Sequence, residues 1–371
     1  MIRLILLGLL SGAFFSSTFV LNELMSAAGG HWFWSASLRY VFVLLLLTAM
    51  IAVQHGMGRI EELWAIFSQH IGFWCITGSI GFGVFYTGIC YAGDHASGWV
   101  VAATFMFTVV TSLLVLLAFG QRFDKKFIFY ALIVFVGVVL VNVSEGLHAP
   151  SDANAIPLTQ MLLYGALPAL IAAFSYPIGN QLVWQASYNA KQPKARHQDR
   201  HQDSEHHSQL MRAETALLAS AHDTADTHSA DRDTANNSTL QTLIRRIPVI
   251  ETDLLQNAFN KVWLMTVGSL PFWLVLGIMV RPELPGSAQV FNTLLVALLS
   301  GVAATSLFLY AREHAVTSSE VAGVDSTQAS EIIFALIGGM ILLGNPLPSA
   351  LGLVGIVLII IGLILFAKMA K

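Results

Sequence analysis

Long apolar runs separated by short polar stretches dominate the chain. A membrane-spanning helix needs about 20 mostly apolar residues. Runs of this kind cover roughly residues 4–24, 32–53, 70–91, 97–119, 127–144, 158–180, 259–280, 289–311, 318–343 and 347–367. Gly29-Gly30, Arg281-Pro282-Glu283 and Gly344-Asn345-Pro346 mark three of the boundaries between them. The pattern predicts an all-α membrane protein with ten spans.

The composition agrees with this pattern. Of the 371 residues, 55% are hydrophobic and only 11% are charged, whereas soluble domains carry about 25% charged residues. A soluble globule could not cover its surface with so few polar side chains, so soluble enzymes, nucleic-acid-binding modules and disordered proteins are excluded. Cys75 and Cys90 lie in one apolar run without metal-ligand spacing, which predicts neither a disulfide framework nor a zinc site.

Short motifs typical of enzymes are missing from the chain. It contains no Gly-x-Ser-x-Gly, no His-Glu-x-x-His and no phosphate-binding loop. These are the signatures of hydrolases, metalloproteases and nucleotide-driven pumps. We therefore expect no enzymatic activity, no catalytic residue, no cofactor and no ATP-driven transport.

A hydrophilic stretch at roughly 189–257 interrupts the series between the sixth and the seventh span. It holds 18 of the 41 charged residues and is rich in His, Asp, Gln and Ser. Few of its residues could form a core, so we predict a mostly disordered loop. The sequence leaves open whether a short amphipathic helix forms near 210–220 and whether residues 240–255 lie at the membrane surface. Its histidines match no structured metal site, so we favour a solvated linker. They are His197, His201, His206, His207, His222 and His228.

The distribution of Lys and Arg predicts the topology. With the N-terminus in the cytoplasm and ten alternating spans, seventeen of the nineteen Lys and Arg residues face the cytoplasm. The hydrophilic loop contributes eight of them, and long loops obey the positive-inside rule weakly. Without that loop the split is still nine to one. We therefore predict that both termini and the 189–257 loop are cytoplasmic.

A short motif occurs twice, 219 residues apart. Residues 91–96 and residues 310–315 both read Tyr-Ala-x-acid-His-Ala. Each copy follows a span with small residues and precedes two further spans, so residues 1–147 hold five spans and residues 148–371 the other five. The second half consists of the sixth span in 148–188, the loop at 189–257 and four spans in 258–371. An odd number of spans per half inverts one half relative to the other, which is the usual construction of secondary transporters.

Three segments carry a similarity to a known family. They are FFSSTFVLNELM and GGHWFWSASLRY near the start, and STQASEIIFALIGGMILLGNPLPSALGLVGIVLIIIG near the end. With ten spans as five plus five, they resemble the drug/metabolite transporter superfamily. The pattern is most similar to its putative multidrug resistance efflux transporter family, related to EamA-type and EmrE-like exporters. The chain has Ser330-Glu331 where many members have Pro, and Asn345 where many have Glu. The resemblance covers the spans but not the loop, and it implies small-molecule export without naming a substrate.

Ionisable residues inside the spans are candidates for function, because a charge at the centre of a membrane helix costs about 2.5–3.5 kcal/mol on insertion scales. Glu331 lies near the middle of the ninth span. A period of 3.6 residues places Glu320 and Thr327 on its face, with Asp325 and Gln328 nearby. Burial favours the neutral form of a carboxyl group, so Glu331 could couple protons or bind a cation. The alternative for Glu331 and for Asp325 is a hydrogen bond to a neighbouring helix.

Arg39 lies eight residues into the second span. It could extend to the membrane surface along its aliphatic stem. It could also pair with Glu331 or Glu23, or bind an anionic group of the substrate. The sequence leaves these options open.

Polar residues recur along one face of the first span, at i, i+4, i+7 and i+11. The face consists of Ser11, Phe15, Thr18 and Asn22. A lipid-facing stripe would need no hydroxyl or amide, so we expect this face to look into the protein. It is either the wall of a substrate cavity or a helix-packing surface, and Gly8-x-x-x-Gly12 favours the second interpretation.

Aromatic and charged residues near the ends of spans offer further candidates. Trp34 and other aromatic residues could hold a lipophilic cation, although an interfacial aromatic belt explains Trp34 more simply. Asp94 and His95 end the third span, and Glu313 and His314 end the eighth. Hydration at a span end is the simpler interpretation of these pairs, and gates on the two membrane faces are the alternative.

These residues together predict a secondary transporter in the inner membrane of a bacterium. It would export a small molecule, either a lipophilic drug or cation or a metabolite, while Glu331 takes up a proton. Two alternatives stay open. One is a transporter of an anionic or zwitterionic metabolite with Arg39 as counter-ion, and the other is a sensor or scaffold that acts through the 189–257 loop. Expected partners are substrate, protons and the lipid bilayer, and no nucleic acid. The oligomeric state stays open, a homodimer included.

Overall fold

Helices joined by short turns make up the computed structural model. It describes residues 2–119, 125–148, 158–188, 247–316 and 318–369, and no strand occurs in this part of the chain. Within it, ten helices are long and apolar enough to cross a membrane. Their bounds are Ile2–Ala27, Trp32–His55, Ile71–Gly93, Gly98–Ala118, Ile128–Leu147, Leu158–Tyr188, Ala258–Val280, Ser287–Glu313, Gly323–Leu343 and Ala350–Lys368. Each overlaps one predicted span, so the prediction of an all-α fold with ten spans is confirmed.

Half of the spans are uninterrupted α-helices and the other half change helix type along their length. The uninterrupted ones are α1 (Ile2–Ala27), α2 (Trp32–His55), α8 (Lys125–His148), α12 (Ala258–Val280) and α17 (Ala350–Met369). The third span consists of α4 (Ile71–Gly78), the π-helix η1 (Ser79–Val84) and α5 (Phe85–Gly93). The eighth consists of α13 (Ser287–Val296), the π-helix η4 (Ala297–Ala304) and α14 (Thr305–Glu313).

Three further spans are interrupted. The fourth breaks between α6 (Gly98–Phe105) and α7 (Thr108–Ala118). The sixth begins with α9 (Leu158–Gln160) and the π-helix η2 (Met161–Ala166). The ninth consists of α15 (Ser318–Ser326), the 3₁₀ turn η5 (Thr327–Ala329) and α16 (Ser330–Leu343). The hydrophobic pattern alone predicted none of these interruptions, because a local change of helix type leaves an apolar run apolar.

The polar boundaries predicted from the sequence end helices for identifiable reasons. Nδ1 of His31 accepts a hydrogen bond from the Phe33 amide at 3.2 Å and caps the start of α2. Gly344 has a φ of 71° at the end of α16, a left-handed conformation that glycine adopts without steric cost. Pro346 follows shortly afterwards and cannot continue a helix. Local capping therefore fixes where these spans begin and end.

One helix lies outside the predicted spans. It is α3 (Met57–Gln69), which connects α2 to α4. Leu63 and Phe67 are buried, whereas Arg59 and Glu62 form an ion pair of 3.3 Å that solvent reaches. The segment is too polar to cross a membrane, and its amphipathic pattern is typical of a helix that lies at a membrane surface.

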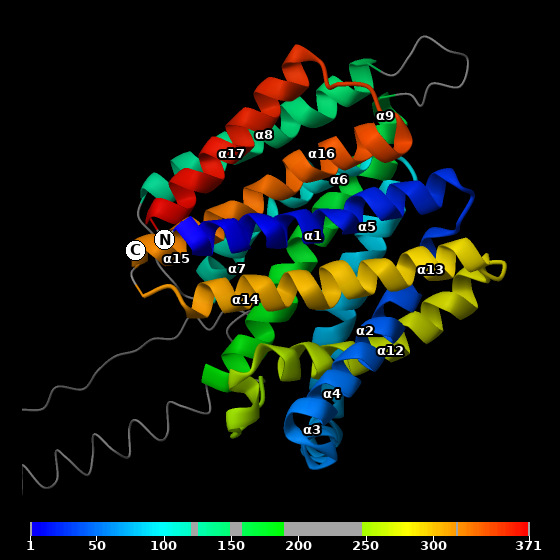
Figure 1. Cartoon of the computed structure of the whole chain (residues 1–371), viewed down its shortest axis with the longest axis vertical. Helices are drawn as coiled ribbons and strands as arrows, with labels where there is room; N and C mark the ends of the chain where they lie inside the picture. Colours follow the sequence, from blue (N-terminus) through cyan, green and yellow to red (C-terminus); the bar gives the residue numbers. More distant parts are fainter. Residues whose placement is uncertain (1, 120–124, 149–157, 189–246, 317, 370–371) are drawn as a thin grey trace, which may run out of the picture. The chain divides into compact units, whose positions relative to one another are not determined.

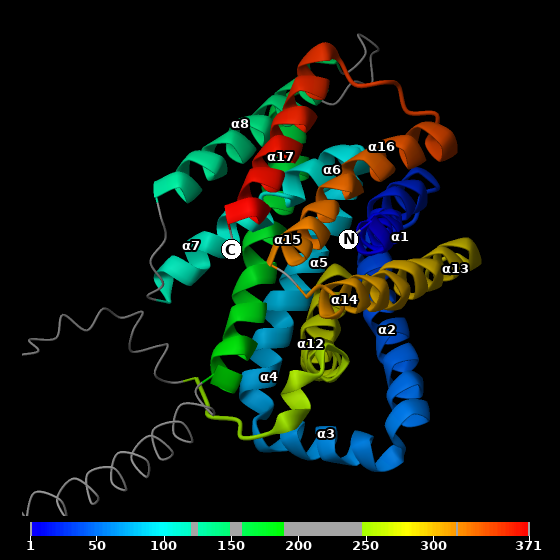
Figure 2. The same ribbon diagram turned by 60° about the vertical axis from the view of Figure 1, so that its left-hand side comes forward.

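Close contacts between glycines let two spans approach each other. Figures 1 and 2 show α8 and α17 side by side along much of their length. A Cβ atom on Gly137 would lie 2.8 Å from the carbonyl oxygen of Gly355, and a Cβ on Gly355 would lie 2.8 Å from that of Gly137. Larger side chains at either position would separate the helices, as expected for small residues at membrane helix contacts.

The chain divides into two compact units, which we describe separately. The first comprises Met1–Gln181 and Asn257–Lys371, and the second comprises Leu182–Gln256. In the second unit Trp184 stacks on Tyr188, and Asp253–Gln256 form the 3₁₀ helix η3. The predicted helix near 210–220 and the histidines of the loop lie outside the described residues.

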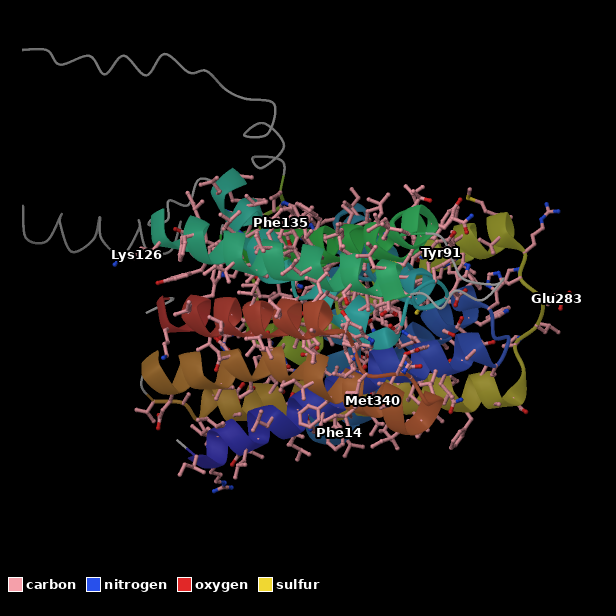
Figure 3. All side chains as sticks on the ribbon, turned by 90° about the horizontal axis from the view of Figure 1, so that it is seen from above. Phe14, Tyr91, Lys126, Phe135, Glu283 and Met340 are labelled. Atoms are coloured by element: carbon pink, nitrogen blue, oxygen red, sulfur yellow. The ribbon has the colours of Figure 1, made fainter. Side chains whose placement is uncertain are left out.

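Within the first unit, turns that the sequence predicted on opposite membrane faces lie far apart. Figure 3 shows Lys126 at the start of α8 and Glu283 between α12 and α13 at opposite ends of the helices. The start of α1 and the end of α17 lie at the same end (Figure 1). A chain that crosses a membrane an even number of times begins and ends on the same side, as the start of α1 and the end of α17 do here.

Candidate functional site

The polar face of α1 points into the first unit, as its pattern predicted. Ser11, Thr18 and Asn22 are buried. Thr18 Oγ1 donates a hydrogen bond to Ser300 Oγ at 2.7 Å, and Asn22 Nδ2 to the Tyr86 hydroxyl at 3.3 Å. Ser11 Oγ donates at 2.8 Å to a backbone carbonyl of η4. The face therefore joins the first span to the third and the eighth.

Arg39 of α2 reaches the same region. Its Nη2 donates to Ser300 Oγ at 3.0 Å, the hydroxyl that also accepts from Thr18. Its guanidinium carbon lies 4.1 Å from the centre of the Tyr86 ring and 5.4 Å from that of Tyr40. These distances allow cation–π attraction to both rings. The side chain is thus held among hydroxyl groups and aromatic faces inside the protein and does not extend to a membrane surface.

No carboxylate accompanies this guanidinium. Among the described residues, neither Glu331 nor Glu23 forms an ion pair with Arg39, so both acidic partners considered from the sequence are absent. The Arg39 Nε atom is enclosed and has no hydrogen-bond partner in the described part of the chain. A positive charge in the protein interior with an unused donor is costly unless something pairs with it.

Aromatic rings form a wall beside Arg39. The Tyr40 ring stacks between Phe82, at 5.1 Å between centroids, and Trp273, at 5.7 Å. Tyr86 meets Tyr40 edge-on at 5.7 Å. All four aromatic side chains are buried. Sequence reasoning missed them, because they come from three spans far apart in the chain and no periodicity links them.

Two of the three π-helices carry residues of this site. Phe82 lies in η1 and Ser300 lies in η4. A π-helical turn adds one residue to the helix and shifts the side chains that follow, and such turns occur often at functional sites. The sequence signal that could have located these π-helical turns is their glycines, because small residues tolerate the locally widened backbone. They are Gly81 and Gly83 in η1 and Gly301 in η4.

We use the name Arg39 cluster for the residues joined by these contacts. It consists of Thr18, Asn22, Arg39, Tyr40, Phe82, Tyr86, Trp273 and Ser300.

Glu331 occupies a different position. It lies in the first turn of α16, near the middle of the ninth span, and is only 7% exposed. No described residue forms a hydrogen bond or ion pair with its carboxyl group. Gly8 and Gly12 of α1 pack directly against Thr327 and Ser330 beside it. The Gly8-x-x-x-Gly12 motif therefore brings the first span against the interrupted segment that carries Glu331.

Tyr176 of the sixth span lies among aromatic side chains. The ring packs on Phe85 and Phe105, at 5.0 and 6.1 Å between centroids, yet 39% of the side chain stays accessible.

The other acidic candidates of the ninth span do not join Glu331. Asp325 forms an ion pair of 3.3 Å with Arg312, and these side chains are 33% and 53% exposed. Glu320 accepts a hydrogen bond from the Val316 amide at 3.0 Å and caps the start of the span. The 3₁₀ turn η5 interrupts the helix between Glu320 and Glu331, and Thr327 and Glu331 are both buried, so a face shared by all three residues stays a prediction. Gln328 lies in η5 and is half-buried.

Trp34 also lies away from the Arg39 cluster. Its Nε1 donates at 2.5 Å to the carbonyl oxygen of Glu283 in the turn between α12 and α13. This placement, at a helix end with its polar atom on a turn, is the one that an interfacial tryptophan adopts.

The two copies of the repeated motif have the same local geometry. His95 Nδ1 lies 2.9 Å from the Tyr91 carbonyl oxygen, and His314 Nδ1 lies 2.9 Å from that of Tyr310. Each histidine ring also packs on the tyrosine of its own copy, at 4.8 and 4.0 Å between centroids.

The acidic residues of the motif lie beside these histidines. Asp94 ends the third span, and burial raises the pKa of its carboxyl group above the ordinary value, opposed by a hydrogen bond with Ser26 and by His95 and His31. Glu313 is exposed at the end of α14. Neither residue contacts the Arg39 cluster in the described structure.

A carboxylate that sequence reasoning considered only as a partner of Arg39 has a different role. Glu23, near the end of α1, accepts hydrogen bonds from the Gly98 amide at 2.7 Å and from Asn345 Nδ2 at 2.7 Å. It thus ties the first span to the start of α6 and to the turn between α16 and α17. At the position of Asn345, many members of the family that the chain resembles have Glu.

Comparisons with known proteins place this arrangement in context. A family model described as "EmrE: Putative multidrug resistance efflux transporter" matches residues 2–371. An uncharacterized protein of Bacillus subtilis (strain 168), YjlA, is 27% identical over 379 residues, covering 98% of this chain and 94% of its own. An uncharacterized 42.1 kDa protein of Shouchella clausii, encoded in the 3' region of the intracellular alkaline protease, is 28% identical over 325 residues. That match covers 84% of this chain and 65% of the Shouchella protein.

The fold also matches a solved structure. A protein crystal structure with 12% sequence identity aligns with a TM-score of 0.51 over 100% of this chain and 99% of its own. That likeness concerns the fold alone. Because the family model spans nearly the whole sequence and ten apolar helices accompany it, the chain is a multi-pass membrane protein that belongs to the EmrE-type multidrug resistance efflux transporter family.

Proposed function

We propose that this protein is a secondary transporter that exports a small molecule across the inner membrane of a bacterium, and that entry of protons drives the export. Membership of an efflux transporter family supports the transport of a small molecule. Glu331 is the proton-carrying residue, and the Arg39 cluster is the substrate site.

The position of Glu331 is the single observation that carries the coupling. A carboxyl group enclosed in the middle of a span, without a hydrogen bond or counter-ion among the described residues, is costly when ionised. A residue needed only for packing would have acquired a partner, as Glu23 has. A carboxyl that alternates between a protonated and an ionised form has no fixed partner, because no single partner suits both forms.

Two inverted halves provide the alternating access. The helix interruptions support this arrangement, since residues 79–84 of η1 shifted by the motif distance of 219 become 298–303, within η4 at 297–304. The breaks in the fourth span, after Phe105, and in the ninth span, at Thr327–Ala329, also correspond approximately. Gly137 and Gly355, which touch each other, are 218 residues apart. Secondary transporters built in this way bind substrate near the midplane between the halves.

Both termini and the 189–257 loop are cytoplasmic in this proposal, in agreement with the positive residues. A proton that enters the cell moves down its gradient, and each elementary charge moved supplies about 2.3 kcal/mol per 100 mV of membrane potential. Glu331 takes up the proton from outside and releases it inside, while the Arg39 cluster carries substrate in the opposite direction.

A pH-gradient assay in proteoliposomes tests the proposal. A panel of small cations, neutral molecules and anions is screened for flux driven by a proton gradient. For any molecule that moves, Glu331→Gln should abolish gradient-driven flux, because an amide of the same shape cannot carry the proton. Glu61→Gln on α3 is the matched control, since Glu61 is exposed outside the spans, and it should transport at the wild-type rate.

One further measurement makes the test decisive. Substrate exchange without a gradient should survive in Glu331→Gln, because exchange requires rocking of the halves but no net proton movement. Gradient-driven flux at the wild-type rate in Glu331→Gln would show that the proton travels by another route and would overturn the role of Glu331.

A further inference from the structure

The Arg39 guanidinium is positioned on one side only. Ser300 Oγ accepts from Arg39 Nη2 at 3.0 Å and is itself held by the Thr18 hydroxyl at 2.7 Å. The Tyr86 ring lies under the guanidinium plane at 4.1 Å. A flexible side chain is therefore fixed in advance of any binding event, at the contact between α1, α2, α5 and η4.

One donor of the guanidinium lacks an acceptor. Arg39 Nε is enclosed and has no hydrogen-bond partner among the described residues. Two acidic side chains of the spans are engaged elsewhere: Glu23 binds Gly98 and Asn345, and Asp325 binds Arg312. An arginine that keeps an unpaired Nε–H in a low-dielectric interior is suited to a planar anion, because a guanidinium can bind a carboxylate through two parallel hydrogen bonds.

The charge around the site indicates a monoanion. In the described part of the chain, the other Lys and Arg residues lie near helix ends or outside the spans. The polar neighbours of Arg39 are the hydroxyl groups of Ser300, Tyr86 and Tyr40 and, one step further, the amide of Asn22. One positive charge balances one negative charge, whereas a phosphate dianion would leave a buried charge uncompensated.

The wall next to Arg39 indicates what the remainder of the ligand resembles. Tyr40 stacks between Phe82 and Trp273, and the Trp273 Nε1 atom is buried without a partner among the described residues. Flat apolar groups stack on such rings with favourable energy. A lipophilic cation would meet the same rings only with Arg39 beside it, and like charges at this distance repel each other.

From these contacts we infer that the substrate is a small organic carboxylate with a flat apolar body, whose carboxylate binds the Arg39 guanidinium. This inference rests on the proposed function and specifies its substrate class. It also chooses between two substrate classes that the sequence left open, because it favours an anion over a lipophilic cation at this site.

Three probes of similar size test it on the purified full-length protein. Benzoate is the carboxylate probe, benzyl alcohol is an uncharged compound of similar size, and benzylammonium is the cationic probe. The affinity of the protein for each is measured by isothermal titration in detergent at one pH. Benzoate should bind about 10-fold or more tightly than either other probe, since a hydrogen bond to a charged group contributes about 1.5–3 kcal/mol. This comparison needs no variant. Benzylammonium binding as tightly as benzoate would overturn the inference.

Variants locate the binding to Arg39. Arg39→Gln should weaken benzoate binding about 10- to 100-fold, and Arg39→Lys should weaken it less, because lysine keeps the charge but loses the planar fork. Arg59→Gln on α3 is the matched control and should bind benzoate like the wild type. Unchanged benzoate affinity in Arg39→Gln would contradict the assignment. Thermal unfolding of each variant confirms that it is folded.

The outcomes separate this inference from the proposed transport. If no carboxylate binds but a proton gradient still drives flux of another molecule in a Glu331-dependent way, the substrate class is wrong and the transport stands. If benzoate binds at Arg39 but no carboxylate moves in proteoliposomes, the site stands and the transport fails.

Discussion

Two glutamates within the spans differ in the hydrogen bonds that their carboxyl groups accept. Glu23, near one end of α1, accepts two hydrogen bonds of 2.7 Å, from the Gly98 amide and from Asn345 Nδ2. Glu331, in the middle of the ninth span, accepts none from the described residues. Both are negatively charged side chains in an apolar stretch of sequence, so composition and hydropathy treat them alike.

The difference teaches how to separate structural from functional charges in this protein. A carboxylate with both oxygens satisfied stabilises a junction of helices, and its removal leaves donors unpaired. A carboxyl without partners contributes nothing to that junction and costs free energy when ionised. The same distinction applies to arginines, since Arg312 pairs with Asp325 whereas Arg39 has an unused donor.

The largest expected effect concerns stability. Glu23→Ala should lower the free energy of unfolding by about 1–3 kcal/mol, because two partly buried donors lose their acceptor. Glu331→Gln should leave it unchanged or raise it, because no hydrogen bond is lost and an ionisable group becomes neutral. Thermal unfolding followed by tryptophan fluorescence in detergent measures both. Equal losses in the two variants would remove the contrast between them.

A smaller effect is expected at the partner of Glu23. Asn345→Ala should cost about 1 kcal/mol, the typical net contribution of one hydrogen bond. Combined with Glu23→Ala it should add little, because the bond is already absent in that background. The double-mutant cycle in the same unfolding assay measures this coupling. Additive losses would show that Asn345 stabilises the turn between α16 and α17 independently of Glu23.

A weak pH dependence is expected from Asp94. Burial raises the pKa of its carboxyl group in the folded protein above the ordinary value of 3.8. A raised pKa in the folded state means that the unfolded state releases the proton first, so this residue's contribution to stability falls as the pH rises above about 4. Asp94→Asn should reduce that slope in unfolding measurements between pH 4 and 7. An identical slope in the variant would assign the dependence to other groups.

The smallest effect is expected at the exposed ion pair. Arg312→Ala should change the free energy of unfolding by about 0–1 kcal/mol, because pairs that solvent reaches contribute little. The same variant should bind benzoate normally, since Arg312 does not contact the Arg39 cluster. A clear loss of gradient-driven flux without a loss of stability would instead identify the Arg312–Asp325 pair as part of a gate.

Much of the fold followed from hydropathy. The ten apolar runs correspond to ten helices, and the predicted boundaries at Gly344-Asn345-Pro346 and Arg281-Pro282-Glu283 end helices. The inward polar face of α1 also followed, because hydroxyl and amide groups cannot face lipid without a partner. α3 was not anticipated, since a surface helix lacks the length and apolarity that identify a span.

The candidate site was only partly foreseeable. Thr18, Asn22 and Arg39 stood out as polar residues in apolar runs, and the structure brings them together. Tyr40, Tyr86, Trp273 and Ser300 did not stand out, because aromatic and small residues are common in every span. Asp325 stood out as an ionisable residue in a span and Trp34 as an aromatic residue near a span end, yet the structure pairs them with Arg312 and the Glu283 carbonyl.

The sequence by itself determined that this protein is a bundle of ten apolar helices, because the cost of exposing a polar backbone to lipid forces long apolar runs into helices. It also determined which few ionisable residues lie within them. Only the tertiary structure decided that Glu23 is paired, and that among the described residues Glu331 has no partner and Arg39 meets aromatic rings and no carboxylate. Partners of a buried charge come from spans hundreds of residues apart, and the π-helices and the 3₁₀ turn that rotate them into place arise from packing between helices, which hydropathy does not record.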